Sequence, residues 1–178
     1  SKEGLRVIAL ASQENAIGLP TVGGHPSATF VGFLGMHDAL RAEVANTIAL
    51  ARDAGIRTVM ITGDHRITAQ KVAEEAGIWK EGDRVLTGRE MEHLSDEELA
   101  NIILGVSVFA RVTPEHKLRI IRAYKNAGNI VAMSGDGVND APSLGAADLG
   151  VAMGGIGTEV AKEAADIVLL DDNLGSII

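Results

Sequence analysis

Residues 133–142 read Met-Ser-Gly-Asp-Gly-Val-Asn-Asp-Ala-Pro. They follow the run Asn-Ile-Val-Ala-Met at 129–133, whose apolar and β-branched side chains are typical of a buried parallel strand. The glycines after this strand allow the backbone to turn sharply and to approach a ligand closely. Asp136 is therefore expected at the carboxyl end of a strand, where open α/β sheets place their ligand sites.

Asn139 and Asp140 follow Asp136 in the same turn. Two carboxylates and an amide on one short turn suit a hard cation such as Mg²⁺, which takes oxygen ligands. We predict that Asp136 is the metal ligand. The alternative is an ordinary strand-to-helix turn in which Asn139 or Asp140 caps the next helix. That alternative is favoured for an isolated Gly-Asp-Gly, but the complete run from 135 to 142 is far more specific.

Two further segments carry candidate site residues. Thr62 and Gly63 end an apolar run and precede a helical pattern, so a hydroxyl and backbone N–H groups could hold phosphate oxygens there. The alternative is that Thr62 only caps the helix. Lys117 lies on the first turns of a helix opened by Pro114. Taken alone, a lysine in that place is usually a solvated charge.

Strands alternate with helices of about ten residues from residue 43 onward, which predicts a parallel sheet covered by helices on both faces. The fold class is thus a three-layer, Rossmann-like α/β domain. The predicted strands cover 5–11, 29–36, 57–61, 84–86, 106–110, 129–133, 149–153 and 167–170. The predicted helices cover 43–54, 68–76, 95–103, 114–126, 141–147 and 158–165.

Composition excludes several classes of protein. The 178 residues carry a net charge of −8 and only 3% aromatic residues, which argues against nucleic acid as a partner. Cysteine is absent, which excludes disulfides and thiolate metal sites, and the five histidines lack the spacing of a zinc site. No apolar run is long enough to cross a bilayer, so the isolated chain is expected to be soluble.

The three motifs together resemble those of the P-type ATPases, ion pumps of the haloacid dehalogenase superfamily. Met-Ile-Thr-Gly-Asp at 60–64 and Phe-Ala-Arg-Val-Thr-Pro-Glu-His-Lys at 109–117 precede the 133–142 run in the family's order. The likeness covers nearly the whole chain, and residues 85–91 are similar to the calcium-pump and sodium-pump branches. The resemblance implies an ATP-driven cation transporter that uses ATP and Mg²⁺, anchored in a membrane and phosphorylated in its cytoplasmic part.

The resemblance also implies roles for individual residues. Thr62 and Gly63 would contact the transferred phosphoryl group, and Lys117 would neutralise phosphate oxygens while opposite charge on Asp136 or Asp140 holds it in place. The implied catalytic residues are Thr62, Gly63, Asp64, Lys117, Asn139 and Asp140. The implied nucleotide-binding residues are Arg6 and Arg111. Arg6 interrupts an apolar strand, and a buried charge needs an anionic partner.

One element of the family pattern is missing, because Asp-Lys-Thr-Gly-Thr, which carries the phosphorylated aspartate, does not occur. We therefore interpret residues 1–37 as the tail of a nucleotide-binding domain with a hinge strand, and residues 38–178 as a phosphorylation domain without its nucleophile strand. The isolated chain is expected to be inactive. The remaining partners would be the rest of the pump polypeptide and a cation bound in a membrane domain outside these residues.

The missing strand would lie between the strands that end at Thr62 and Ser134. Three outcomes are open: another segment fills the gap, the two strands pair directly, or the chain is part of a longer polypeptide, which we favour. Two other functions are also open. A free-standing phosphatase of the same superfamily would need a second aspartate two residues after Asp38, where Leu40 stands. The other is a non-enzymatic domain that binds nucleotide or phosphate, or that docks to a partner chain.

Overall fold

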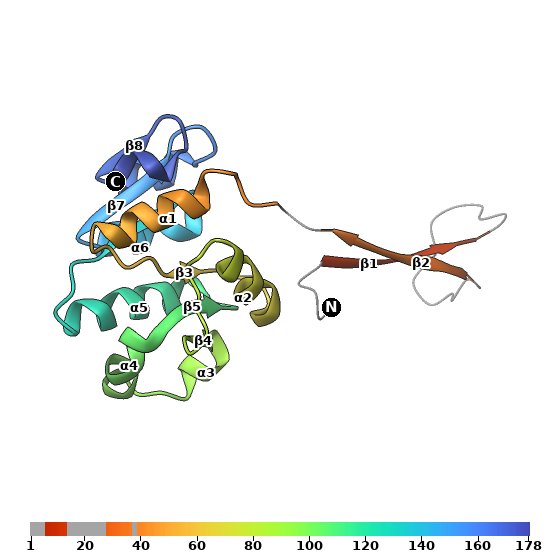
Figure 1. Ribbon diagram of the computed structural model, residues 1–178, viewed down its shortest axis with the longest axis horizontal. Coiled ribbons are helices and arrows are strands. Elements are labelled where there is room, and N and C mark those ends of the chain that lie inside the picture. The colour runs from red at the N-terminus through yellow and green to blue at the C-terminus, as the bar shows by residue number, and fades with distance from the viewer. Residues whose placement is uncertain (1–5, 14–27, 37–38) are drawn as a thin grey trace. The chain divides into compact units, whose positions relative to one another are not determined.

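The computed structural model describes residues 6–13, 28–36 and 39–178. Backbone contacts divide the chain into two units, Ser1–Ala39 and Leu40–Ile178, and each is described by itself (Figure 1). The boundary predicted at Asp38 lies outside the described residues, next to this division. The identities proposed for the two parts stay predictions.

The first unit is an antiparallel hairpin of β1 (Arg6–Ser12) and β2 (Thr29–Met36), which pair from Arg6 opposite Met36 to Ser12 opposite Thr29. Apolar side chains are exposed along both strands: Val7, Ile8, Leu10, Phe30, Val31, Phe33, Leu34 and Met36. A two-stranded hairpin with no further layer is marginally stable in water. These apolar side chains therefore require a cover that the described residues of the hairpin do not provide.

The second unit contains two parallel sheets of three strands each. The first has the order β3 (Met60–Ile61), β5 (Val106–Ala110), β4 (Arg84–Thr87). The second has the order β6 (Ala132–Gly135), β7 (Leu149–Met153), β8 (Ile167–Leu169). The parallel arrangement confirms the predicted fold class, but the strands form two sheets where one was expected.

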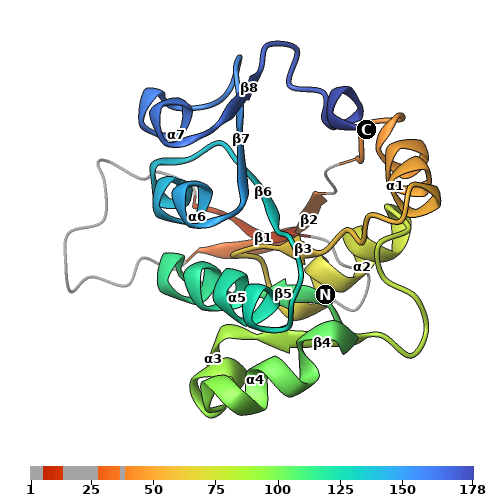
Figure 2. The same ribbon diagram turned by 90° about the vertical axis from the view of Figure 1, so that its left-hand side faces the viewer.

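Helices cover both sides of these strands, as the alternating pattern predicted. Figure 2 shows α5, α6 and α7 along one side and α1 and α2 along the other. The helices are α1 (Val44–Asp53), α2 (Arg66–Glu75), α3 (Gly88–Glu92), α4 (Asp96–Ile102), α5 (Pro114–Asn126), α6 (Ala141–Ala146) and α7 (Glu159–Ala164). Short 3-10 turns lie at η1 (Ile103–Gly105), η2 (Val138–Asp140) and η3 (Leu174–Ile177).

The core is centred on β5, whose five residues are all buried. Phe109 packs into a cluster with residues of α5, whereas Val108 and Ala110 face a cluster with Ala69 and Ala73 of α2. This alternation follows from the two-residue period of a strand. It explains why the run at 106–110 is continuously apolar apart from one serine.

The two sheets share part of their core. Ile61 of β3 and Val131, just before β6, both pack against the cluster around Phe109 and against the cluster around Leu144. The sheets therefore belong to one folded unit although no backbone pairing joins β3 to β6 among the described strands.

Most strands lie within one residue of their predicted bounds, and two differ by more. The strand expected at 57–61 is paired only at Met60–Ile61, because its partner β5 meets it only from Val108 onward. The strand expected at 129–133 begins at Ala132, because the Asn129 N–H donates to the carbonyl of Tyr124 and closes the end of α5 instead. Among the unpaired apolar residues, Val59 and Val131 pack against the core, whereas Ile130 is 90% exposed.

One helix was not predicted from the sequence. Residues 88–92 form α3, and Thr87 caps it in a reciprocal arrangement with Glu90. The spacing Thr-x-x-Glu is that of a capping box and could have indicated this helix. The same spacing occurs at Ser95 and Glu98, and the helix predicted at 95–103 is confirmed as α4.

Strands β3 and β6 each keep one side without a strand partner among the described residues. The carbonyl of Val131 accepts from Asp148 and Leu149 on the β7 side, and β3 pairs only with β5. Direct pairing of the two strands, one of the three predicted outcomes, is therefore wrong. No described strand fills the gap either, and membership in a longer polypeptide stays a prediction.

Candidate functional site

The three motifs follow three strands directly. Thr62 comes after β3, Arg111 after β5, and Asp136 after β6. Because the strands within each sheet are parallel, these residues lie at the carboxyl ends, where α/β sheets place their ligand sites. The strand-to-helix turns therefore carry the candidate site.

Lys117 and Asp140 form an ion pair between α5 and the turn after β6. The Lys117 Nζ donates to Asp140 Oδ1, and the two side chains are only 18% and 10% exposed. Asp140 Oδ2 accepts from the backbone N–H groups of Asp136, at 3.3 Å, and Gly137, at 3.1 Å. The sequence left Asp136 and Asp140 open as partners of Lys117, and the structure identifies Asp140.

Gly135 permits this arrangement. A Cβ at that position would lie 2.6 Å from the Cβ of Asp140, a distance that side chains do not tolerate. The predicted cap of the next helix has a different form here. Asp140 precedes α6 but makes no side-chain cap bond to it, because its carboxylate points back to the turn that precedes it.

Asp136 is the carboxylate that remains available for a ligand. Its side chain is exposed, and no hydrogen bond to it is recorded among the described residues, while its carbonyl accepts from Thr158 N–H at 2.8 Å. The described part of the chain contains no group of three acidic or histidine side chains that could hold a metal by itself. Mg²⁺ fits a single carboxylate, since it keeps several waters and completes its shell with substrate phosphate.

Thr62 forms a local turn with Asp64. Its Oγ1 accepts from Asp64 N–H at 3.0 Å and donates to Asp64 Oδ2 at 3.1 Å, and both Gly63 and Asp64 are exposed. Helix α2 is capped by His65, whose Nδ1 accepts from Ile67 N–H at 3.5 Å. The alternative in which Thr62 caps this helix is therefore wrong, although its hydroxyl does bond to the backbone, at Asp64 N–H.

Arg111 lies beside the Thr62 turn. Its N–H donates to the carbonyl of Asp64 at 3.0 Å, and Val112 N–H donates to the carbonyl of Thr62 at 3.2 Å. Arg111 has a φ of 52°, and its side chain is exposed. These backbone hydrogen bonds join the predicted segment at 60–64 to the predicted segment at 109–117.

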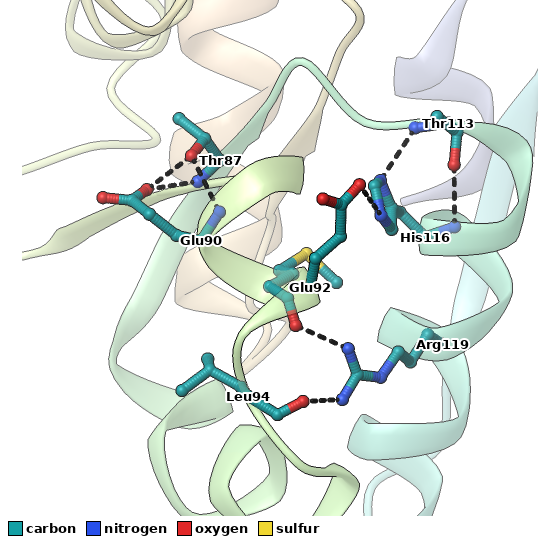
Figure 3. A network of polar contacts seen from close by, with 8 residues as sticks. Thr87, Glu90, Glu92, Leu94, Thr113, His116 and Arg119 are labelled. Carbon is teal, nitrogen blue, oxygen red and sulfur yellow. Dashed lines mark hydrogen bonds and ion pairs between the residues drawn. The ribbon is translucent and has the colours of Figure 1, made fainter.

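A polar network holds α3 against the start of α5 (Figure 3). His116 Nδ1 accepts from Thr113 N–H at 3.1 Å, and its Nε2 lies 3.6 Å from Glu92 of α3. Arg119 donates to the carbonyls of Met91 and Leu94, the first at 2.6 Å. The network fixes the first two turns of α5, which carry Lys117, and sequence reasoning missed it.

The N-terminal cap of α3 pairs Thr87 with the carboxylate of Glu90. Thr87 Oγ1 and N–H both donate to Glu90 Oε2 at 2.7 Å, and Arg66 pairs with Glu90 Oε1 at 2.8 Å. The Thr87 hydroxyl holds the pKa of Glu90 below its ordinary value, and Arg66 adds to this effect. The cap thus favours the ionised form of this carboxylate.

The predicted residues fall into two groups. One joins Lys117, Asp136 and Asp140, and the other joins Thr62, Asp64 and Arg111. No hydrogen bond or ion pair recorded among the described residues connects the groups. The remaining residues are Gly63 and Asn139, both exposed, and Arg6, whose side chain lies outside what the structure describes.

A cavity lies away from these residues. It is lined by Arg52, Arg57 and Asp83 among others, and none of the candidate site residues borders it. The two arginines donate to main-chain carbonyls of Gly77, at α2's end, and of Leu104. This cavity is separate from the candidate site, and its arginines stabilise the ends of neighbouring elements.

Comparisons with known proteins point to one group. Residues 7–148 match the family model of haloacid dehalogenase-like hydrolases. The chain is 51% identical over 179 residues to calcium-transporting ATPase 1 of Bacillus cereus, covering 100% of this chain and 20% of that protein. It is 49% identical over 152 residues to calcium-transporting ATPase 1 of Saccharomyces cerevisiae, covering 84% of this chain and 16% of that protein.

A third relative agrees. Calcium-transporting ATPase 1 of Lactococcus lactis is 46% identical over 181 residues, covering 100% of this chain and 20% of that protein. The chain thus spans about a fifth of the length of these relatives. Within the residues that the structure describes, no helix has the length and apolar character needed to cross a membrane.

Proposed function

Because the chain belongs to the haloacid dehalogenase-like hydrolase family, we propose that it supplies most of the phosphorylation domain of a calcium-transporting P-type ATPase. The names of the relatives support the class of pump and its cation. The observation that carries the proposal is the ion pair of Lys117 with Asp140. It brings the lysine of one motif onto the turn of another, as a phosphoryl-transfer site requires.

In this proposal, Lys117 and Asp136 act on the transferred phosphoryl group. Asp136 would hold Mg²⁺, which would supply positive charge to offset the charge on the phosphate oxygens during transfer. Lys117 neutralises further phosphate charge, and Asp140 keeps its ammonium group in place. Asn139, exposed on the same turn, completes the polar surface that faces the phosphoryl group.

Thr62 and Gly63 hold phosphoryl oxygens, and their neighbours hold ATP. Gly63 is exposed after β3, so its N–H can approach an anion. Asp64 and Arg111, joined by a backbone hydrogen bond, are proposed to flank the nucleotide, and Arg6 to contact its phosphates. Binding of the nucleotide would draw the two groups of site residues to one substrate.

The accepting aspartate is proposed to lie on a strand outside these 178 residues. The open sides of β3 and β6 support this arrangement, since a strand between them would reach the ends of both motifs. An aspartyl phosphate divides a difficult hydrolysis into two easier steps that can be coupled to ion movement. Residues 1–37 would then end the nucleotide-binding domain, and 38–178 would form the phosphorylation domain.

The test uses Asp136→Asn in the full-length pump, with Asp53→Asn, an exposed carboxylate on α1, as the matched control. Labelled ATP should give no acid-stable, hydroxylamine-sensitive phosphoenzyme in Asp136→Asn at ordinary Mg²⁺, while the control matches the parent protein. The isolated chain should give none either. Normal phosphoenzyme in Asp136→Asn would contradict the assignment.

A further inference from the structure

The loop between β7 and α7 is hydrogen-bonded to the backbone of Asp136, the proposed metal ligand. Thr158, the N-cap residue of α7, donates its N–H to the carbonyl of Asp136 at 2.8 Å. Asp140 accepts from the N–H of Asp136 at 3.3 Å. The backbone of Asp136 is therefore held at both its N–H and its carbonyl, although its carboxylate is exposed.

The same loop is anchored by a carboxylate from the C-terminal part of the chain. Asp172 Oδ1 accepts from Gly155 N–H at 2.9 Å, and Asp172 Oδ2 accepts from Ile156 N–H at 3.1 Å. Hydrogen bonds from backbone N–H groups to an ionised carboxylate are among the stronger ones in proteins. Asp172 thus closes the loop from 16 residues further along the chain.

Two glycines of this loop lie where a side chain would not fit. A Cβ at Gly155 would lie 2.6 Å from Asp172 Oδ2, and a Cβ at Gly157 would lie 1.9 Å from the carbonyl oxygen of Met153. The glycines therefore allow the loop to approach Asp172 and β7 closely. A displacement of the loop's centre would be passed on to Thr158.

Asp172 itself adopts an uncommon backbone conformation. Its φ is 53°, in the left-handed region that aspartate tolerates better than most residues. Its N–H donates to the carbonyl of Leu169 at 3.2 Å, and its carbonyl accepts from Arg41 Nη1 at 3.0 Å. These contacts, together with the two loop amides, maintain a conformation that would otherwise be disfavoured.

We propose that Asp172 is a positioning residue for Asp136, acting through Gly155, Ile156 and Thr158. This inference rests on the proposed function, in which Asp136 binds Mg²⁺. Mg²⁺ demands near-ideal octahedral geometry, so the direction of the Asp136 carboxylate affects how tightly the ion binds. Asp172 does not touch Asp136 or the reacting groups. It fixes the loop whose last residue fixes the Asp136 carbonyl.

The test compares Asp172→Asn with Asp171→Asn in the full-length pump. Asp171 is the matched control, because its carboxylate accepts from Asn173 N–H and Ser176 Oγ and does not contact the loop. Asp172→Asn leaves only one oxygen for two loop amides. We expect the Mg²⁺ concentration for half-maximal phosphoenzyme to rise roughly ten-fold, the usual effect of losing a partner that orients a metal ligand.

Two readouts separate positioning from general stability. In Asp172→Asn, the phosphoenzyme level at saturating Mg²⁺ should stay near the parent value. The ATP concentration for half-maximal phosphorylation should also stay near the parent value. Partial unfolding would instead lower the maximal phosphoenzyme level without changing its Mg²⁺ dependence. Gly155→Ala, which pushes the loop from the Asp172 carboxylate, should shift the Mg²⁺ dependence in the same direction. This second variant tests the contact without changing Asp172.

Failure of this inference and failure of the proposed function give different results. If Asp136→Asn is inactive but both Asp172→Asn and Gly155→Ala keep the parent Mg²⁺ dependence, the positioning role is overturned and the function stands. If Asp136→Asn is phosphorylated normally, the function is overturned, and with it the premise for Asp172. A shift of equal size in Asp171→Asn would also overturn the role, since that residue does not contact the loop.

Discussion

Asp140 accepts hydrogen bonds from three residues with one carboxylate. One oxygen accepts from Lys117, and the other accepts from the N–H groups of Asp136 and Gly137. A buried charge is tolerated when it is paired and its remaining lone pairs are satisfied, and both conditions hold here. The residue therefore joins helix α5 to the turn that carries the proposed metal ligand, in addition to any part in catalysis.

Ser143, three residues further along, has no such compensation. It is fully buried in α6, and its Oγ has no hydrogen-bond partner among the described residues. An unsatisfied buried hydroxyl costs about 1–3 kcal/mol. We expect Ser143→Ala to raise the free energy of unfolding by about 1 kcal/mol, measured by urea denaturation.

The control is Ser107→Ala, which removes a hydroxyl that is also buried but donates to Asp83 Oδ2 at 2.7 Å. This variant should be less stable than the parent chain. Destabilisation by Ser143→Ala would mean that its hydroxyl has a partner, such as an ordered water, that the described residues do not include.

At the scale of elements, carboxylates at helix starts make the fold sensitive to acid. In α4, Ser95 N–H donates to Glu98 Oε2 at 2.7 Å, and this bond holds the pKa of Glu98 below its ordinary value of 4.5. A carboxyl with a lowered folded-state pKa stabilises the fold above its unfolded pKa. That stabilisation is lost as the pH falls through the folded pKa.

We therefore expect Glu98→Gln to reduce the loss of stability on acidification. Between about pH 7 and pH 3, the urea midpoint should fall less in Glu98→Gln than in the parent chain, because the amide cannot be protonated in this range. Glu97→Gln, exposed in the same helical turn and without a recorded hydrogen bond among the described residues, is the control. Equal pH profiles for the parent and Glu98→Gln would contradict the link between this cap and acid stability.

At the scale of the whole molecule, the two sheets of Leu40–Ile178 share core residues but no strand pairing. Successive N–H groups of a strand point to opposite sides. Thr62 N–H donates to β5, so the Ile61 N–H points to the open side of β3. The Val131 carbonyl faces β7, so the N–H groups of Ala132 and Ser134 point to the open side of β6.

Hydrogen exchange tests whether a strand covers these sides. In the isolated chain, the amides of Ile61, Ala132 and Ser134 should exchange rapidly, and in the full-length pump they should slow by at least roughly ten-fold. Thr62, whose N–H donates to Phe109, is the internal control and should change less. Equal rates for the open-side amides in both proteins would contradict the proposal of a strand from outside these residues.

The sequence by itself was sufficient for the elements whose local pattern agrees with their packing. The bounds predicted for β2, β5, α5 and β7 are those of the structure. These segments combine a clear apolar period with an unambiguous start or stop, such as Pro114 for α5. The fold class follows from the alternation of strands and helices, and the resemblance of the three motifs to those of P-type ATPases supplied the candidate site residues.

Only the tertiary structure decided what depends on contacts between distant residues. It selected Asp140 over Asp136 as the partner of Lys117, divided the strands into two sheets, and linked Asp172 to the loop beside Asp136. The physical reason is that a charge or a strand edge has several acceptable partners in sequence, whereas packing leaves room for one. Local pattern determines which residues are able to pair, and three-dimensional proximity determines which of them do.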